Sequence, residues 1–211
     1  MQKLSATKTR IIQTAISLYN EHGMFHVLNQ DIAEAADISL SNFNYHFPKK
    51  KDLIFTVCGY LSYVLHHRIK QNSLLTNDGI ILELNRIFLQ FEHDFRFFYL
   101  DTHNILRTHP DLKKEMELQV KQDIQMIKNL NYIAIGKGYM ELEPTNFKGL
   151  YDIIANQIWM ISHFWYAQST LKKEEGNILI QGLEQCYAIL YPHLTPLGKE
   201  VYSNFIKEQA Q

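Results

Sequence analysis

Side chains that can hydrogen-bond to nucleic acid cluster between residues 39 and 51 of this 211-residue chain. An asparagine amide such as that of Asn42 carries a donor and an acceptor, so it can bridge N6 and N7 of adenine in the major groove. Neighbouring hydroxyl and imidazole groups can donate to phosphate oxygens. Lysines follow at 49–51, and lysines at the start of a helix attract phosphate. The candidate DNA-contacting residues here are Ser41, Asn42, Asn44, Tyr45, His46 and Lys50.

Two short helices joined by a turn, over about residues 29–36 and 39–47, are predicted to position this polar set. Asn29 and Ser39 are expected as the two N-caps, because both can accept hydrogen bonds from a first turn. Asn29 and Gln30, at the start of the first helix, would join the DNA-facing set. A helix-turn-helix needs these parts, but an ordinary helical hairpin with a polar exposed face fits the pattern equally well. The inner side of the second helix should be buried by side chains at i, i+3 and i+7: Leu40, Phe43 and Phe47.

The stretch resembles the DNA-binding domain of the tetracycline-repressor (TetR) family over about the first quarter of the chain. Two positions depart from the family pattern. Ser41 stands where many members have glycine, and Asn44 stands where most have a phosphate-contacting tyrosine, a contact that Tyr45 would take over. The matching residues are Thr9-Arg10-Ile11-Ile12, Ala15, Leu18-Tyr19, Gly23, Asp31-Ile32-Ala33, Ser39, Phe43, His46-Phe47, Lys50 and Leu53.

The resemblance implies a DNA-binding domain over residues 1–52 and an effector-binding and dimerisation domain over residues 53–211. It implies a cytoplasmic transcriptional regulator, a repressor that a small molecule releases from a palindromic operator in double-stranded DNA. In this family the helix predicted over residues 50–72 links the two domains, so its tilt would carry the signal. A different interpretation stays open, an all-α ligand-binding or protein-interaction module with no sequence-specific DNA binding.

Composition is that of an ordinary globular chain, with 46% hydrophobic and 20% charged residues. The net charge of −1 argues against a protein that coats nucleic acid by bulk charge. No secretory signal is visible, and the most apolar run, 153–167, is too short to span a membrane. Cys58 and Cys186 lack partners at metal-ligand spacing, so we expect free thiols in a reducing cytoplasm.

The rest of the chain shows helical periodicity without strand-like alternation, so the predicted fold class is all-α. The helix expected over residues 146–171 is apolar nearly all round, which requires cover on both sides. A second copy of the chain is the simplest cover, and with the following helix it would give a four-helix homodimer interface. Gly182 in that following helix permits close approach. The expected helices cover about residues 7–23, 29–36, 39–47, 50–72, 78–93, 95–108, 111–136, 146–171, from after the break at 172–176 to 191, and a tail after Pro196.

Aromatic residues with polar tips are concentrated in the predicted helices that wall an effector pocket in the TetR family. Such side chains around an apolar cavity suit a mostly apolar ligand with one or two polar groups. Each of them alone is more simply a core residue. The predicted ligand-binding residues are Tyr60, Tyr63, Phe88, Phe91, Phe95, Phe98, Tyr99, His103, Trp159 and His163.

No residue pattern supports an enzyme, a metal site or a cofactor. The adjacent pair His66-His67 points about 100° apart on a helix and cannot share one metal well. Gly136-Lys137-Gly138 lacks the preceding strand and following helix of a phosphate loop. No nucleophile elbow or Ser/His/Asp set is recognisable. We therefore expect neither catalytic residues nor metal or cofactor binding.

Overall fold

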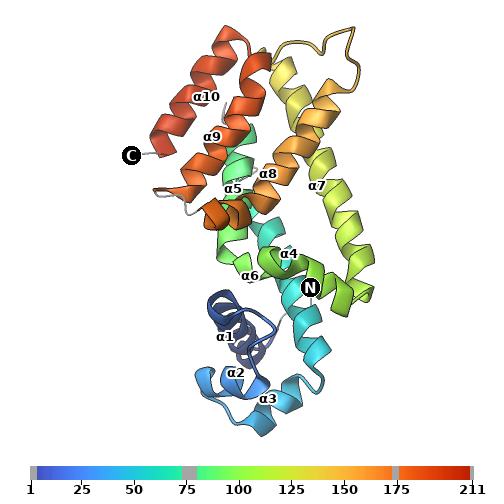
Figure 1. Ribbon diagram of the computed structural model, residues 1–211, viewed down its shortest axis with the longest axis vertical. Helices are drawn as coiled ribbons and strands as arrows, with labels where there is room; N and C mark the ends of the chain where they lie inside the picture. The colour runs from blue at the N-terminus through green and yellow to red at the C-terminus, as the bar shows by residue number, and fades with distance from the viewer. Residues whose placement is uncertain (1–3, 73–79, 173–175, 210–211) are drawn as a thin grey trace. The chain divides into compact units, whose positions relative to one another are not determined.

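The computed structural model describes residues 4–72, 80–172 and 176–209, and the regular elements in these ranges are helices (Figure 1), as predicted. The predicted loop at 72–77 largely lies outside the described residues, as do the first residues of the helix expected from 78 and most of the break at 172–176. The helices are α1 Ala6–His22, α2 Asn29–Ala35, α3 Leu40–His46, α4 Lys50–Asn72, α5 Ile80–Asp94, α6 Arg96–Thr108, α7 Asp111–Gly136, α8 Leu150–Lys172, α9 Ile178–Leu190 and α10 Pro196–Gln209, with a 3₁₀ turn at Tyr191–His193.

The chain forms two compact units. The first unit comprises residues 1–68 and 95–114, and the second comprises residues 69–94 and 115–211. The helix α6 therefore belongs to the same unit as α1, α2 and α3. The predicted division at residue 52 concerns which part binds DNA and which binds the effector, and it stays a prediction.

The first unit is built on α1, whose predicted apolar stripe is buried. Ser5 caps this helix, because its hydroxyl accepts a hydrogen bond from the Lys8 N–H at 3.3 Å. The same helix holds α6: the Tyr19 and Phe97 rings lie 5.4 Å apart, and the Asn20 side-chain oxygen accepts from the Phe97 N–H at 3.1 Å. A hydrogen bond at a helix start satisfies a backbone donor that has no partner within the helix. The buried stripe consists of Ile11, Ile12, Ala15, Ile16 and Tyr19.

The second unit has its core where α5, α8 and α9 meet, and α8 and α9 lie side by side (Figure 1). Leu89, Trp165 and Leu183, one from each helix, form a buried cluster. A Cβ added to Gly182 would lie 2.8 Å from side-chain atoms of both Leu89 and Trp165. The close approach predicted at this glycine thus occurs within the chain. The Trp165 indole N–H donates to the Ile178 carbonyl at 2.6 Å, which satisfies its buried polar atom.

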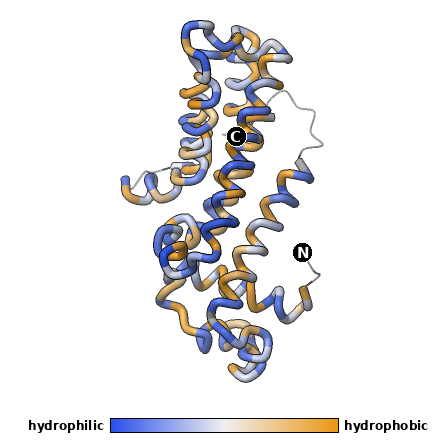
Figure 2. Tube along the Cα trace, turned by 90° about the vertical axis from the view of Figure 1, so that its right-hand side faces the viewer, coloured by the Kyte–Doolittle hydropathy of each residue, from blue (hydrophilic) through white to orange (hydrophobic). Residues whose placement is uncertain are grey.

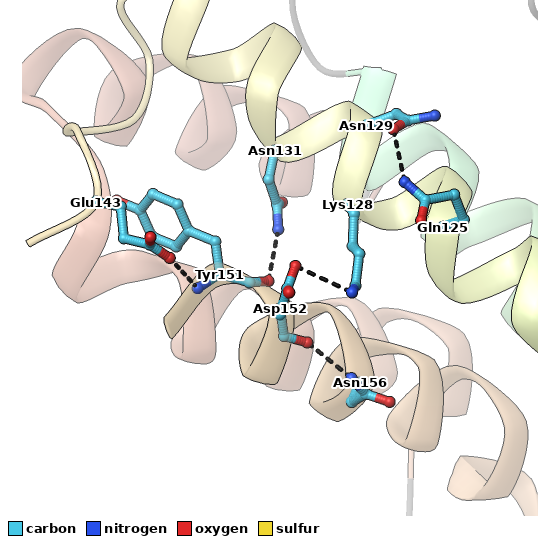
Figure 3. Close-up of polar contacts among 8 residues, drawn as sticks. All are labelled: Gln125, Lys128, Asn129, Asn131, Glu143, Tyr151, Asp152 and Asn156. Atoms are coloured by element: carbon cyan, nitrogen blue, oxygen red, sulfur yellow. Dashed lines mark hydrogen bonds and ion pairs between the residues drawn. The ribbon is translucent and has the colours of Figure 1, made fainter. Parts of the chain in front are cut away.

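A polar junction between α7 and the start of α8 holds these two helices together (Figure 3). The Glu143 carboxylate accepts from the Tyr151 N–H at 3.0 Å and so caps the first turn of α8. From α7, Asn131 donates to the Tyr151 carbonyl at 3.4 Å, and Lys128 pairs with Asp152 at 3.0 Å. The junction therefore orients the helix that carries Trp159 and the residues after it.

The helix predicted from residue 146 begins at residue 150, because Gly149, with φ +84°, turns the chain just before it. Hydrophobic and hydrophilic residues alternate along the helices (Figure 2). The helix α8 nevertheless keeps apolar side chains on an exposed face. Ile153, Met160 and Phe164 on that face remain about half exposed within the chain. In the parts of the chain that the structure describes, no helix combines the length and apolarity that crossing a membrane requires.

Candidate functional site

The turn between α2 and α3 sets the angle at which α3 is presented. The Ile38 N–H donates to the Ala33 carbonyl and the Asp37 N–H donates to the Glu34 carbonyl, each at 3.0 Å. These two bonds, around a residue in the left-handed region, form a Schellman motif. Asp37 is that residue, with φ +50°. The sequence analysis placed a connection here but missed the motif, although aspartate is one of the few residues that tolerate this conformation.

Replacing Asp37 tests whether the backbone of this turn matters. Asp37→Gly should leave the first unit at least as stable, because glycine adopts positive φ without strain. Asp37→Val should cost about 1–2 kcal/mol, because its Cβ clashes in the left-handed region. Urea unfolding followed by circular dichroism measures both, and amide hydrogen exchange locates the loss in α2 and α3. Equal stability of the two variants would contradict the left-handed conformation of residue 37.

The start of α2 differs from the prediction. The N-cap is Leu28, and Asn29 is already inside the helix. Leucine cannot accept a hydrogen bond, so the polar partner at this end is Asp31, whose carboxylate accepts from the Leu28 N–H at 2.7 Å. The prediction of Asn29 as cap was wrong because an acid three residues after the cap serves the same end of the helix.

The inner side of α3 is anchored by two aromatic rings. Phe43 and Phe47 are almost fully buried, with ring centroids 5.9 Å apart, as predicted. Ser39 is confirmed as the N-cap, since its hydroxyl accepts from the Asn42 N–H at 3.1 Å. The prediction that Leu40 is buried was wrong. Leu40 is 42% exposed, because it lies in the first turn of α3, next to the exposed polar face. That face therefore includes a leucine that the sequence analysis assigned to the core.

The outer side of α3 carries no acidic residue and has Tyr45 as its most prominent side chain, 80% exposed. The Tyr45 and His46 rings meet edge to face at 5.2 Å. Gln30 on α2 is exposed and donates to Glu34 at 3.0 Å, while Asn29 is half-buried. The remaining residues of the predicted set are placed as follows: Ser41, Asn42 and Asn44 are exposed on α3, His46 is half-buried, and Lys50 begins α4.

The start of α4 follows α3 directly, and three consecutive lysines, at 49–51, lie there. The Asp52 carboxylate accepts from the Lys49 N–H at 3.1 Å and so stabilises this end of the helix. Exposed amide and aromatic groups on α3, followed by a helix start with lysines, can bind base edges and phosphates together. The first unit thus contains the two short helices and the turn of a helix-turn-helix, with polar side chains exposed on the second helix.

The predicted ligand-binding residues are divided between the two units. Ring contacts link three of them in the second unit: His163 lies 5.8 Å from Phe88 and stacks on Trp159 at 4.5 Å. Phe91 is buried in the same unit. The members in the first unit are Tyr60, Phe98 and Tyr99, which are half-buried, Phe95, which is buried, and Tyr63 and His103, which are exposed.

The interior of the second unit also holds polar residues that the sequence analysis did not single out. Glu92 is 1% exposed, and burial raises its pKa to about 8. Asp123 and Asn85 are buried as well. Burial lowers the pKa of His163 to about 4, so this imidazole is neutral at physiological pH. The sequence gives no sign that Glu92 on α5 and Asp123 on α7 are buried, because their burial depends on packing against α8.

The cysteines offer no reactive thiol in the second unit. Burial raises the pKa of Cys186 to about 12, so its thiol stays protonated. Cys58 is half-buried in α4. Among the described residues, no group of three or more His, Cys, Asp or Glu side chains could hold a metal ion.

Two protein-family sequence models match this chain, one near its start and one over most of the remainder. The sequence model described as "Bacterial regulatory proteins, tetR family" matches residues 11–57, which contain α2 and α3. The model described as "Bacterial transcriptional repressor" matches residues 70–202. No curated protein sequence matches the chain.

Solved structures of similar fold cover nearly the whole chain. A TetR-family transcriptional regulator from Marinobacter aquaeolei VT8 has a TM-score of 0.81 at 21% identity, over 97% of this chain and 98% of that one. A transcriptional regulator from Saccharomonospora viridis in complex with choline has a TM-score of 0.72 at 15% identity, over 90% and 98%. The ketosteroid transcriptional regulator KstR2 of Mycobacterium tuberculosis has a TM-score of 0.60 at 16% identity, over 92% and 97%.

The family models cover both the helix-turn-helix and most of the remaining chain, and the second of them alone spans more than half of it. The all-α order of elements and the position of α3 agree with these matches. This chain belongs to the TetR family of bacterial transcriptional regulators.

Proposed function

We propose that this protein is a cytoplasmic, homodimeric repressor that binds a palindromic operator through α3 and leaves it when a small molecule binds. The observation that carries the proposal is the acid-free outer face of α3, held outward by the buried rings of Phe43 and Phe47. A short helix fixed in this way can enter the major groove as a rigid body.

The residues on this face have different proposed roles. Asn42 and Asn44 are candidates for base edges, because each amide can pair with adenine. Tyr45 and Lys50 are candidates for phosphate contacts. The rest of the proposed DNA-facing set is Asn29, Gln30, Ser41 and His46.

Two substitutions should separate base contacts from phosphate contacts. Asn42→Ala should cost about 1–3 kcal/mol on the operator and relax sequence preference. Lys50→Ala should weaken binding to all sequences alike and reduce the salt slope by about one unit. Fluorescence anisotropy across a salt series measures both effects. Asn204→Ala, an exposed asparagine on α10, is the control. If both variants bound operator DNA as the wild type does, the proposal that this face contacts DNA would be wrong.

The proposed dimer is supported by the outer face of α8. Ile153, Met160 and Phe164 recur at i, i+7 and i+11, so they share one side of the helix. These half-exposed apolar side chains would be buried by the same face of a second copy. Two-fold symmetry then predicts an operator with half-sites about one helical turn, or a multiple of it, apart.

The proposed effector is supported by the polar and aromatic interior of the second unit. Of the structures of similar fold, one regulator is in complex with choline and another is a ketosteroid transcriptional regulator, and these two compounds differ greatly in chemistry. The ligand of this chain must therefore be inferred from its own residues. The ten predicted ligand-binding residues remain candidates one by one, and the four in the second unit, Phe88, Phe91, Trp159 and His163, are those proposed for the ligand site of that unit.

A further inference from the structure

We propose that the second unit binds an organic cation that carries a hydrogen-bond acceptor, with Glu92 as the counter-charge and Asn85 and Trp159 as the donors. This inference deepens the proposed function, because the cation would be the effector. It is based on buried polar atoms of Asn85, Glu92 and Trp159, which follow one another along the contact between α5 and α8. We call these atoms the polar line.

The register of α5 against α8 follows from two contacts. Phe88 meets His163 at 5.8 Å between ring centroids, and Glu92 accepts a hydrogen bond from the Tyr166 N–H at 3.1 Å. Residue numbers rise together along both helices, so the helices run parallel here. Asn85 and Trp159 lie about one helical turn before Phe88 and His163, respectively. They are therefore at the same height along the two parallel helices.

Glu92 forms one end of the polar line. One of its carboxyl oxygens accepts from the Tyr166 N–H, and the other, Oε2, is buried without a partner among the described residues. A buried carboxyl in this condition favours either protonation or a cation beside it. A ligand cation would convert the neutral acid into a paired carboxylate, in a place where aromatic rings also favour positive charge.

The other buried charged groups of the second unit agree with a cationic ligand. A second acid, Asp123, is buried on α7, where it accepts from Gln119 at 2.8 Å and lies 3.8 Å from the His163 imidazole. That imidazole is neutral, and no lysine or arginine is among the buried residues that the structure describes. The partnerless oxygen of Glu92 therefore has no buried cationic side chain beside it among the described residues, which favours a positively charged guest.

Asn85 and Trp159 form the other end of the polar line. The Asn85 amide nitrogen and the Trp159 indole nitrogen are both buried and lack an acceptor in the described parts of the chain. Two unpaired donors at one level are costly unless an acceptor reaches them. A ligand carbonyl or ether oxygen would satisfy both. Asn85 and Glu92 are seven residues apart on α5, which separates their Cα atoms by about 10 Å along the helix. Their side chains can converge on a ligand shorter than that.

The test compares two probes that differ in charge: 4-acetylbenzylammonium and 4-acetylbenzyl alcohol. Both carry a carbonyl at one end and a hydrogen-bond donor at the other. Ligand-observed NMR titrations at a pH near the pKa of Glu92 give their dissociation constants. The wild-type protein should prefer the amine by about tenfold or more, a difference of about 1.4 kcal/mol.

The variant Glu92→Gln keeps an acceptor for the Tyr166 N–H, removes the charge and replaces the second oxygen with an amide NH2 group. It should lose the preference for the amine while its affinity for the alcohol changes less than about threefold. Glu115→Gln, the same change at an exposed position on α7, should keep the preference. Equal binding of both probes by the wild type, an amine preference that survives in Glu92→Gln, or binding of neither probe would overturn the inference. Operator binding is measured without probe, so failure of the repressor proposal is seen separately.

Discussion

Phe43→Ala should abolish DNA binding by unfolding the helix-turn-helix rather than by removing a contact. Phe43 is 1% exposed and packs against Phe47, so truncation leaves a cavity that neighbouring side chains cannot fill. Large aromatic-to-alanine changes in cores cost about 3–5 kcal/mol. Amide hydrogen exchange should show lost protection in α1, α2 and α3, and anisotropy should show lost binding.

The matched control is Tyr45→Ala, an aromatic residue two positions along the same helix that is 80% exposed. Its stability should stay within about 0.5 kcal/mol of wild type, since it buries little surface. Its DNA affinity should fall because a proposed phosphate contact is lost. If the two variants had the same stability, the inward and outward faces of α3 would be assigned wrongly.

Gly198→Ala should destabilise the second unit by about 3 kcal/mol, at the upper end of what overpacking costs. An added Cβ would lie 2.0 Å from the Tyr139 carbonyl oxygen, which is backbone and cannot rotate away. The start of α10 would have to move. That movement would break the bonds by which Thr195 holds this corner: its N–H to the Tyr139 carbonyl at 3.0 Å and its hydroxyl to the Gly138 carbonyl at 2.7 Å.

Urea unfolding followed by tryptophan fluorescence measures this loss, because both tryptophans of the chain, Trp159 and Trp165, lie on α8 in the same unit. Gly59→Ala on α4 is the control, since a Cβ there would meet nothing within 4 Å. Gly59 lies in the first unit, so circular dichroism follows this variant, which should gain about 0.5–1 kcal/mol from better helix propensity. A Gly198→Ala protein as stable as wild type would mean that α10 does not dock closely at residue 139.

The sequence predicted the features that depend on local spacing. Helix periodicity, the Ser39 cap and the inward rings of Phe43 and Phe47 were all recoverable, because each depends on residues within one or two turns. Where two local solutions compete, the prediction was wrong. Asn29 and Asp31 can both serve the start of α2, and the structure uses Asp31. Leu40 has the right spacing for burial but lies in the first, exposed turn.

Features that depend on packing between distant segments could not be predicted. Glu92 has an ordinary place on an amphipathic helix, and only α8 turns it into a buried carboxyl. The attachment of α6 to α1 through Tyr19 and Phe97 joins residues nearly eighty positions apart. Periodicity shows which face of a helix is apolar, but it does not show which helix covers that face.

Operator binding is tested by an anisotropy titration of the purified protein against the intergenic DNA upstream of its own gene, with scrambled duplex as competitor. We expect tight binding that resists the competitor, saturates at one dimer per palindromic site and weakens as salt rises. Binding no tighter than to the scrambled duplex would contradict the claim that the outer face of α3 reads this DNA.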